Sequence, residues 1–211
     1  LFRRENAKTI HITDLDSFEN SGANYDLIMG ISRSLDIPIS IFSNFKDKGD
    51  CAKYLDDGIY RLIVKELPLR DPDTVRDLIK HYTASRFAFF FDGADKTETL
   101  TDGTKVDYYE FRDIVKSLGG NRIVYHDSNW VDHAIDFEEL TDIGAPGIRI
   151  TVYGGVRTPQ ELWTLDDMIS FGLDSVIMKK ALYENDFPCQ NIWRIAEADL
   201  EPHEQKLKNG K

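Results

Sequence analysis

The sequence predicts an α/β fold, a (β/α)₈ (TIM) barrel whose first strand would precede Leu1. Three observations predict it. Short β-branched or aromatic runs alternate with amphipathic stretches, which indicates a parallel sheet covered by helices. Strand candidates such as Phe87–Phe91 are continuously apolar, as expected for strands buried on both faces. The third observation is an internal repeat that spans about half of a barrel.

The predicted strands and helices alternate along the chain. The strands are Ile10–Leu15, Ile37–Phe42, Arg61–Leu67, Phe87–Phe91, Arg122–His126, Ile148–Tyr153 and Ser175–Met178. The helices are Tyr25–Leu35, Lys48–Asp57, Asp73–Ala84, Tyr108–Leu118, Phe137–Ile143, Gln160–Phe171 and Cys189–Ala198. Because a closed barrel needs eight strands, the first is expected upstream of Leu1. We expect a single barrel domain over residues 1–200 and a polar C-terminal tail over residues 201–211.

The internal repeat favours a barrel over an open doubly wound sheet. Residues 37–46 align with residues 148–157, and residues 57–65 align with residues 171–179, so that strands and the turns after them coincide. Two similar halves are expected when each half is a βαβ-containing unit. The alternative is the general likeness of all βαβ units.

Composition excludes several classes of protein. The formal net charge of −11 argues against a nucleic-acid binder, which usually presents a basic face, and favours solubility. No apolar run approaches the roughly 20 residues that span a bilayer, and the N-terminus does not resemble a signal peptide. Cys51 and Cys189 have neither a metal-binding spacing nor a disulfide framework. We therefore expect a cytoplasmic monomer with no membrane partner and no metal.

The sharpest motif is YGGVRT at residues 153–158, where a strand ends in Gly154 and Gly155 shortly before a helix begins. Glycines let the backbone approach a ligand closely, and a helix N-terminus offers unpaired N–H donors to an anion. The phosphate site of α/β barrels often lies after the last two strands, where Lys179 and Lys180 follow the final strand. The motif predicts a phosphate cradle, with a plain tight turn as the alternative.

Longer segments extend this motif into a family resemblance. IRITVYGGVRTPQEL and GLDSVIMKKALYEN resemble the end of the histidine-biosynthesis barrel family, and IHITDLDSF and DIPISIFSNFKDKGDCAKYLDDGIYRLIV resemble earlier parts of it. The similarity covers nearly the whole chain and is closer to the isomerase branch than to the cyclase branch. It implies an Amadori rearrangement of a phosphoribosyl aminoimidazole carboxamide from aminoaldose to aminoketose. It also implies that no metal or organic cofactor takes part and that the substrate carries a phosphate at each end.

The resemblance also implies which residues exchange protons with the substrate. Asp92 matches the family's catalytic aspartate of the fifth barrel strand, and the partner aspartate would lie before Leu1. Asp14 matches an acidic residue of the second strand, and Asp127 occupies the corresponding end of the sixth. His126 stands where the family has a hydroxyl residue, and a histidine can titrate near neutral pH. The alternative roles are a turn residue for Asp92, hydrogen-bonding support for Asp14 and structural packing for His126.

Departures from the family pattern support a second function class. Ser43 and Asn44, which are predicted to bind a second phosphate, stand where the family usually has a glycine-rich turn. Lys179 stands where a glycine is expected, and Lys65 stands where small residues are typical. The alternative to an isomerase is therefore a catalytically inactive or repurposed barrel that binds a phosphorylated metabolite or a partner protein. A third possibility is a synthase subunit that receives ammonia from a glutaminase partner. The polar segment 93–107 is expected to form a lid or a solvated hairpin.

Overall fold

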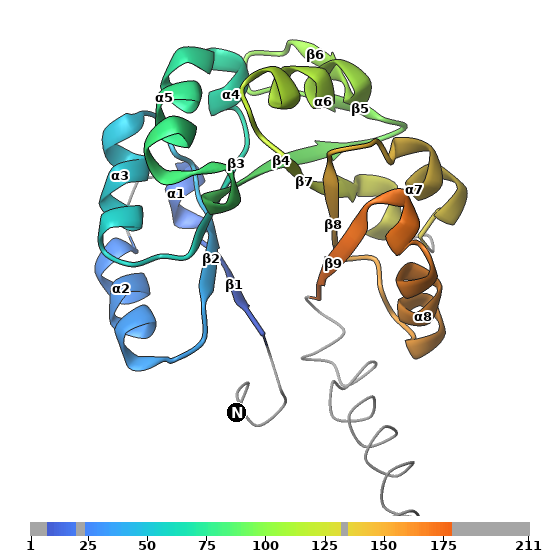
Figure 1. The fold of residues 1–211 in the computed structure, drawn as a ribbon, viewed down its shortest axis with the longest axis horizontal. Helices are drawn as coiled ribbons and strands as arrows, with labels where there is room; N and C mark the ends of the chain where they lie inside the picture. Colours follow the sequence, from blue (N-terminus) through green and yellow to red (C-terminus); the bar gives the residue numbers. More distant parts are fainter. Residues whose placement is uncertain (1–7, 20–23, 132–134, 179–211) are drawn as a thin grey trace, which may run out of the picture.

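A computed structural model describes residues 8–19, 24–131 and 135–178, and seven parallel strands form one curled sheet in them (Figure 1). The strand order is β1-β2-β3-β4-β7-β8-β9, as expected for successive βα units, and β5 and β6 form a separate antiparallel hairpin. The strands are β1 (Ile10–Thr13), β2 (Ile39–Phe42), β3 (Arg61–Val64), β4 (Phe87–Gly93), β5 (Thr97–Thr99), β6 (Lys105–Asp107), β7 (Arg122–Asp127), β8 (Arg149–Tyr153) and β9 (Leu173–Ile177).

The sheet is curled enough for strands that are not neighbours in it to touch. The Thr13 hydroxyl of β1 lies 3.2 Å from the Tyr153 hydroxyl of β8, although β9 follows β8 in the strand order. The fold is therefore most of a (β/α)₈ barrel, as the alternation of elements predicts. In the described residues β1 and β9 are the edges of the sheet, and the strand predicted before Leu1 lies outside the sequence.

Helices cover the outside of the curled sheet, with α2, α3 and α5 beside β1 to β3, and α7 and α8 beside β8 and β9 (Figure 1). Every helix in the described residues is too short or too polar to cross a membrane. The helices are α1 (Asp16–Glu19), α2 (Tyr25–Ser34), α3 (Lys48–Asp56), α4 (Leu67–Arg70), α5 (Pro72–Tyr82), α6 (Tyr108–Ser117), α7 (Phe137–Ile143) and α8 (Pro159–Asp167).

Side-chain caps begin five of these helices. The N-cap residues Asp47, Asp71, Asp107, Asp136 and Thr158 each accept a hydrogen bond from a backbone N–H of the first turn of α3, α5, α6, α7 and α8. Such a cap stabilises a helix by about 1 kcal/mol, and the negative charge of an aspartate also favours the positive end of the helix dipole. Part of the acidity of the chain is therefore structural.

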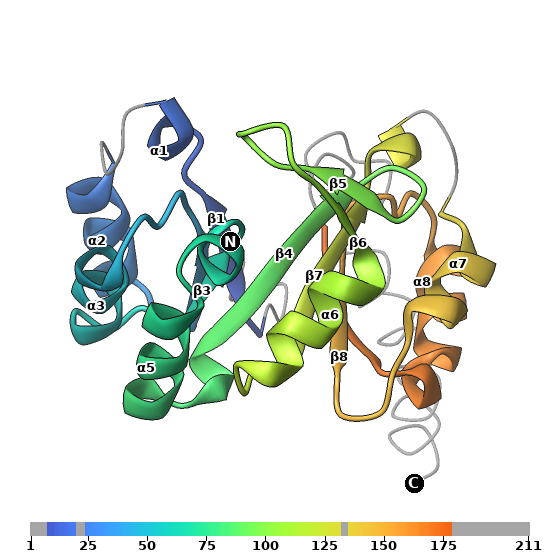
Figure 2. The same cartoon turned by 90° about the horizontal axis from the view of Figure 1, so that it is seen from above.

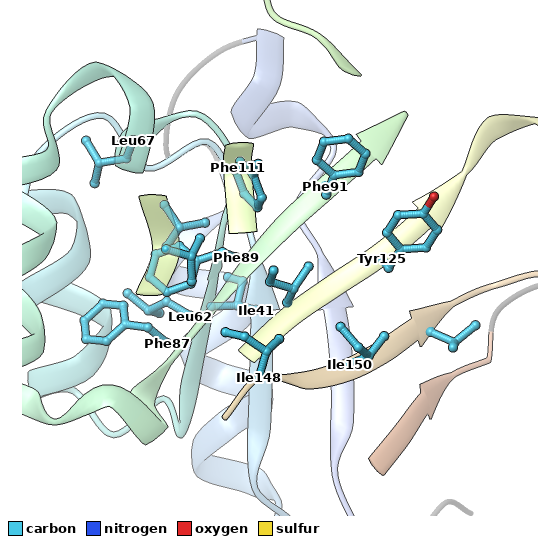
Figure 3. Packing of buried hydrophobic residues seen from close by; sticks show 14 of the residues in the cluster. Ile41, Leu62, Leu67, Phe87, Phe89, Phe91, Phe111, Tyr125, Ile148 and Ile150 are labelled. Carbon is cyan, nitrogen blue, oxygen red and sulfur yellow. The ribbon is translucent and has the colours of Figure 1, made fainter. Parts of the chain in front are cut away.

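Alternating side chains give the sheet an outer and an inner apolar layer. On the outer face Phe87, Phe89 and Phe91 of β4 pack with residues such as Leu67 and Phe111 of the covering helices (Figure 3). On the inner face Ala88 and Phe90 belong to a separate cluster that fills the barrel interior. The members of the inner cluster are Phe42, Ile63, Ala88, Phe90, Val124 and Tyr153. Asp92 continues the inward positions of β4, so the pleat directs its carboxylate into the barrel mouth.

Two predicted elements differ from the structure. The strand predicted over Arg61–Leu67 ends at Val64, and Leu67 begins α4, because Pro68 has no N–H to donate to a strand ladder. The polar segment 93–107 forms the β5–β6 hairpin, but it is not wholly solvated, since Glu98 is only 2% exposed. Figure 2 shows this hairpin across the end of β4. The predicted helix Cys189–Ala198 and the tail 201–211 lie outside the described residues.

A partly buried ion pair lies at the N-terminal end of the barrel strands. Arg122 begins β7, is 7% exposed and binds both carboxylate oxygens of Asp174 at 2.5 and 2.6 Å. Its Nη1 also donates to the hydroxyls of Thr151 and Ser175 at 2.9 and 3.1 Å. Burial raises the pKa of the Asp174 carboxyl, but the hydrogen bonds and charge of Arg122 outweigh burial and hold this pKa below its usual value.

Replacing Arg122 with methionine is expected to lower the free energy of unfolding by about 3 kcal/mol, because it strands a partly buried carboxylate. The matched change Arg112→Met removes an ion pair with the exposed Asp113 and should cost at most about 1 kcal/mol. A depressed folded-state pKa contributes stability that is lost as pH falls, so the deficit of the Arg122 variant should shrink below about pH 4. Urea unfolding at pH 7 and pH 3.5 measures both effects. Equal losses for the two variants would contradict this assignment.

Candidate functional site

Three polar side chains converge where β3, β4 and β7 end. Asp92 and His126 are directly paired residues in the β4–β7 ladder, and Lys65 follows the last residue of β3. Because parallel strands end at one edge of the barrel, residues far apart in the sequence meet there, and the active sites of such barrels lie at this edge. The structure thus brings the predicted residues Asp92 and His126 together.

The Asp92 carboxylate and the His126 imidazole form a hydrogen bond. Oδ1 of Asp92 lies 2.7 Å from Nδ1 of His126. An ionised carboxylate can only accept, so Nδ1 is the donor and Nε2 is the nitrogen left to accept or deliver a proton elsewhere. The Asp92 side chain is 35% exposed and that of His126 is 14% exposed. A small molecule in the mouth can therefore reach the carboxylate.

Aromatic rings fix the plane of the imidazole. Phe90 is stacked beside the His126 ring, with 6.5 Å between the ring centroids. Tyr153 and Trp130 meet the same ring edge-on at 5.6 and 6.2 Å. Such contacts restrict the rotamers of an imidazole and orient its two nitrogens. Trp130 is thus part of the wall around His126.

Lys65 and Glu98, neither of them among the site residues predicted from the sequence, complete the charged cluster. Nζ of Lys65 lies 3.7 Å from Oδ2 of Asp92 and 3.2 Å from Oε1 of Glu98. Oε2 of Glu98 accepts the backbone N–H of Asp92 at 3.0 Å. Burial raises the pKa of the Glu98 carboxyl, and the charge of Lys65 opposes this rise. Period-2 alternation from Ile63 could have pointed Lys65 inward, but no sequence signal marked Glu98 in its polar segment.

The other two predicted carboxylates face away from this cluster. Asp14 directly follows β1, so strand alternation turns it to the side opposite to Thr13. It is 3% exposed, and its Oδ1 accepts from the side-chain amide of Asn24 at 2.7 Å. Asp127 is equally buried, and it accepts the backbone N–H groups of Asn129 at 2.7 Å and Asp95 at 3.3 Å. The geometry favours the alternative of hydrogen-bonding support for Asp14, and Asp127 has a similar set of contacts.

The predicted phosphate cradle uses most of its described amides internally. Gly154 and Gly155 both have a φ of 76°, which only glycine adopts readily. The Gly154 N–H donates to the carbonyl of Ile177 at 2.9 Å. The Arg157 and Thr158 N–H groups both donate to the Glu161 carboxylate, at 2.7 and 2.8 Å. Glu161 therefore already holds a negative charge at the N-terminus of α8.

The remaining predicted phosphate residues fall into two groups. Ser43 is 4% exposed, and the Asn44 N–H donates to the Ser17 hydroxyl at 2.9 Å, so this turn is also internally bonded. Lys179 and Lys180 lie outside the described residues. In the described part of the chain, no group of three or more His, Cys, Asp or Glu side chains is placed to hold a metal ion.

Gly155→Ala is expected to destabilise the protein by about 3 kcal/mol or more, through a left-handed backbone and overpacking. A Cβ there would lie 2.8 Å from Cγ1 of Ile135 and 3.1 Å from Cε3 of Trp130. The control Gly103→Ala has a φ of 85° with nothing within 4 Å of the new Cβ, so only the backbone cost of about 1 kcal/mol remains. Thermal unfolding compares the two, and equal losses would argue against close packing at Gly155.

Comparison with known proteins agrees with the fold. The family model described as "Histidine biosynthesis protein" matches residues 1–188. A protein of Chlorobium phaeobacteroides (strain BS1) is 34% identical over 200 residues, 92% of this chain and 77% of the relative. One of Chlorobaculum parvum (strain DSM 263 / NCIMB 8327) is 34% identical over 207 residues, 95% of this chain and 80% of the relative. Both are named 1-(5-phosphoribosyl)-5-((5-phosphoribosylamino)methylideneamino) imidazole-4-carboxamide isomerase. The chain therefore belongs to the histidine-biosynthesis protein family.

Proposed function

We propose that the protein is an aldose–ketose isomerase, an intramolecular oxidoreductase that converts a phosphoribosyl aminoimidazole carboxamide from aminoaldose to aminoketose. The observation that carries this proposal is the Asp92–His126 hydrogen bond at the edge where the strands of the barrel end. The names of the relatives support the same reaction class. The family expectation that the reaction uses no cofactor is part of the proposal.

The reaction needs an acid and a base, which a carboxylate–imidazole pair can supply. An acid protonates the ring oxygen of the ribose as the bond from this oxygen to C1 breaks, which leaves a protonated imine at C1. A base then removes the proton from C2 to give an enolamine, which becomes the aminoketose as C1 gains a proton and the C2 hydroxyl loses one. C1 is reduced and C2 is oxidised within one molecule, so no external oxidant or reductant is required. Positioned acids and bases typically accelerate such transfers by about 10²–10⁴-fold.

In the proposed mechanism His126 delivers or accepts a proton through Nε2 while Asp92 holds Nδ1. This division follows from the geometry, because Nδ1 is already engaged with Oδ1 of Asp92. The Asp92 side chain is 35% exposed at the barrel mouth, so its carboxylate can serve as the second proton-transfer group. The partly exposed pair stands above the apolar inner cluster, which closes the barrel interior beneath it.

Asp92→Asn and His126→Asn are each expected to lower kcat by about 100-fold or more, because each removes a proton-transfer group. Asp95→Asn is the control, since Asp95 is an exposed carboxylate in the same segment of the chain. The assay is turnover of the phosphoribosyl carboxamide substrate by the full-length protein, with circular dichroism to check folding. Activity unchanged in both site variants would refute the assignment, and a folded wild type without turnover would refute the isomerase itself.

A second candidate function is a divergent barrel that binds a phosphorylated metabolite or a partner protein without turning it over. The observation that favours it is the internal bonding of the amides beside Gly154, Thr158 and Asn44. Under this hypothesis the mouth is a binding site, and Asp92 serves as a member of an ion pair and not as a catalytic acid or base.

Titration calorimetry with ribose 5-phosphate distinguishes the two candidates. A non-catalytic binder is expected to bind the compound in wild type and to show no turnover in the isomerase assay. Glu161→Gln should strengthen phosphate binding, because the glutamine lacks the charge that competes at the start of α8. Turnover at rates typical of enzymes would rule out the second candidate.

A further inference from the structure

The β5–β6 hairpin is fastened to the barrel mouth by two consecutive residues that follow β3. Lys65 pairs with Glu98 of β5, and the next residue, Glu66, accepts the backbone N–H and the hydroxyl of Thr101 at 2.9 and 2.7 Å. We call these two contacts, Lys65–Glu98 and Glu66–Thr101, the clasps of the hairpin. Only the Lys65–Glu98 clasp contacts a residue of the proposed acid–base pair.

The Lys65–Glu98 clasp reaches Asp92 from two directions. Lys65 Nζ lies 3.7 Å from one carboxylate oxygen of Asp92, while His126 holds the other oxygen. Glu98 binds the Asp92 backbone N–H at 3.0 Å, which fixes the end of β4 itself. The backbone and both carboxylate oxygens of Asp92 are thus held by groups from three different elements.

Burial restricts what Lys65 can do. Glu98 is 2% exposed, and a carboxylate that loses its partner in such a place costs several kcal/mol. Within the described residues Lys65 supplies the only positive charge bound to Glu98, and the Asp92 N–H is its only other donor. Lys65 therefore cannot turn away to bind a substrate phosphate without stranding Glu98.

We propose that Lys65 and Glu98 are a pair of positioning residues that hold the Asp92 carboxylate against His126 for the isomerisation. The proposal rests on the proposed function. The charged or titratable groups that face Asp92 from neighbouring elements are Lys65, Glu98, His126 and Tyr153.

The test compares Glu98→Gln and Lys65→Met with Thr101→Val, which loosens the other clasp of the same hairpin. Because Lys65→Met strands Glu98, the double variant Lys65→Met/Glu98→Gln is included, in which both charges are removed together. The clasp variants and the double variant are expected to lower kcat by about 100-fold with little change in KM, since they misplace a reacting group without removing a substrate contact. Lys65→Arg keeps the positive charge and should retain most of the wild-type kcat, and Thr101→Val should retain all of it.

A spectroscopic measurement separates failure of this proposal from failure of the proposed function. The imidazole ¹⁵N signals of His126 are identified among the five histidines by their loss in His126→Asn. These signals should move in Glu98→Gln and in the double variant and stay in place in Thr101→Val, whether or not the wild type turns substrate over. Unmoved signals, or a kcat that falls equally in Thr101→Val, would overturn the proposal.

Discussion

The register between β4 and β7 is the constraint on which the barrel mouth depends. It places Asp92 directly beside His126, and a shift by one residue would turn one of the two side chains to the opposite face. Phe87, Phe89 and Phe91 fix that register, because their outward positions are buried beneath the helices. The relative position of Asp92 and His126 therefore depends on the packing of these three phenylalanines along β4.

Charge is distributed unevenly along the barrel axis. At the start of the strands Arg122 is neutralised by Asp174, and at the end of the strands Lys65 lies between Asp92 and Glu98. An apolar layer that includes Phe42, Ile63 and Phe90 separates the two clusters. Charges in these clusters are paired rather than isolated, which is the condition under which a barrel interior tolerates them. The Arg122–Asp174 pair stabilises the fold, whereas the cluster around Lys65 leaves Asp92 partly exposed at the mouth.

The sequence predicted the elements better than it predicted their ends and contacts. Continuous apolar strands such as Phe87–Phe91 have a clear local signature, and the order of the parallel sheet follows from the alternation with helices. The contact between Asp92 and His126 can be predicted from the sequence, because both residues stand at the ends of neighbouring parallel strands. The burial of Glu98 cannot, because it depends on how the β5–β6 hairpin folds back onto β4. Nor could the sequence show that Glu161 would occupy the amides beside Thr158, since a capping pattern and an anion cradle use the same start of a helix.

Trp130 connects the two halves of the mouth. Its ring meets the imidazole of His126 edge-on and would lie 3.1 Å from a Cβ at Gly155, while its carbonyl accepts from the Arg157 guanidinium at 2.8 Å. A molecule that displaces the glycine turn must also alter the surroundings of this indole. Because the chain has three tryptophans, the part of its fluorescence that follows events on both sides of the mouth is the part that Trp130→Phe removes.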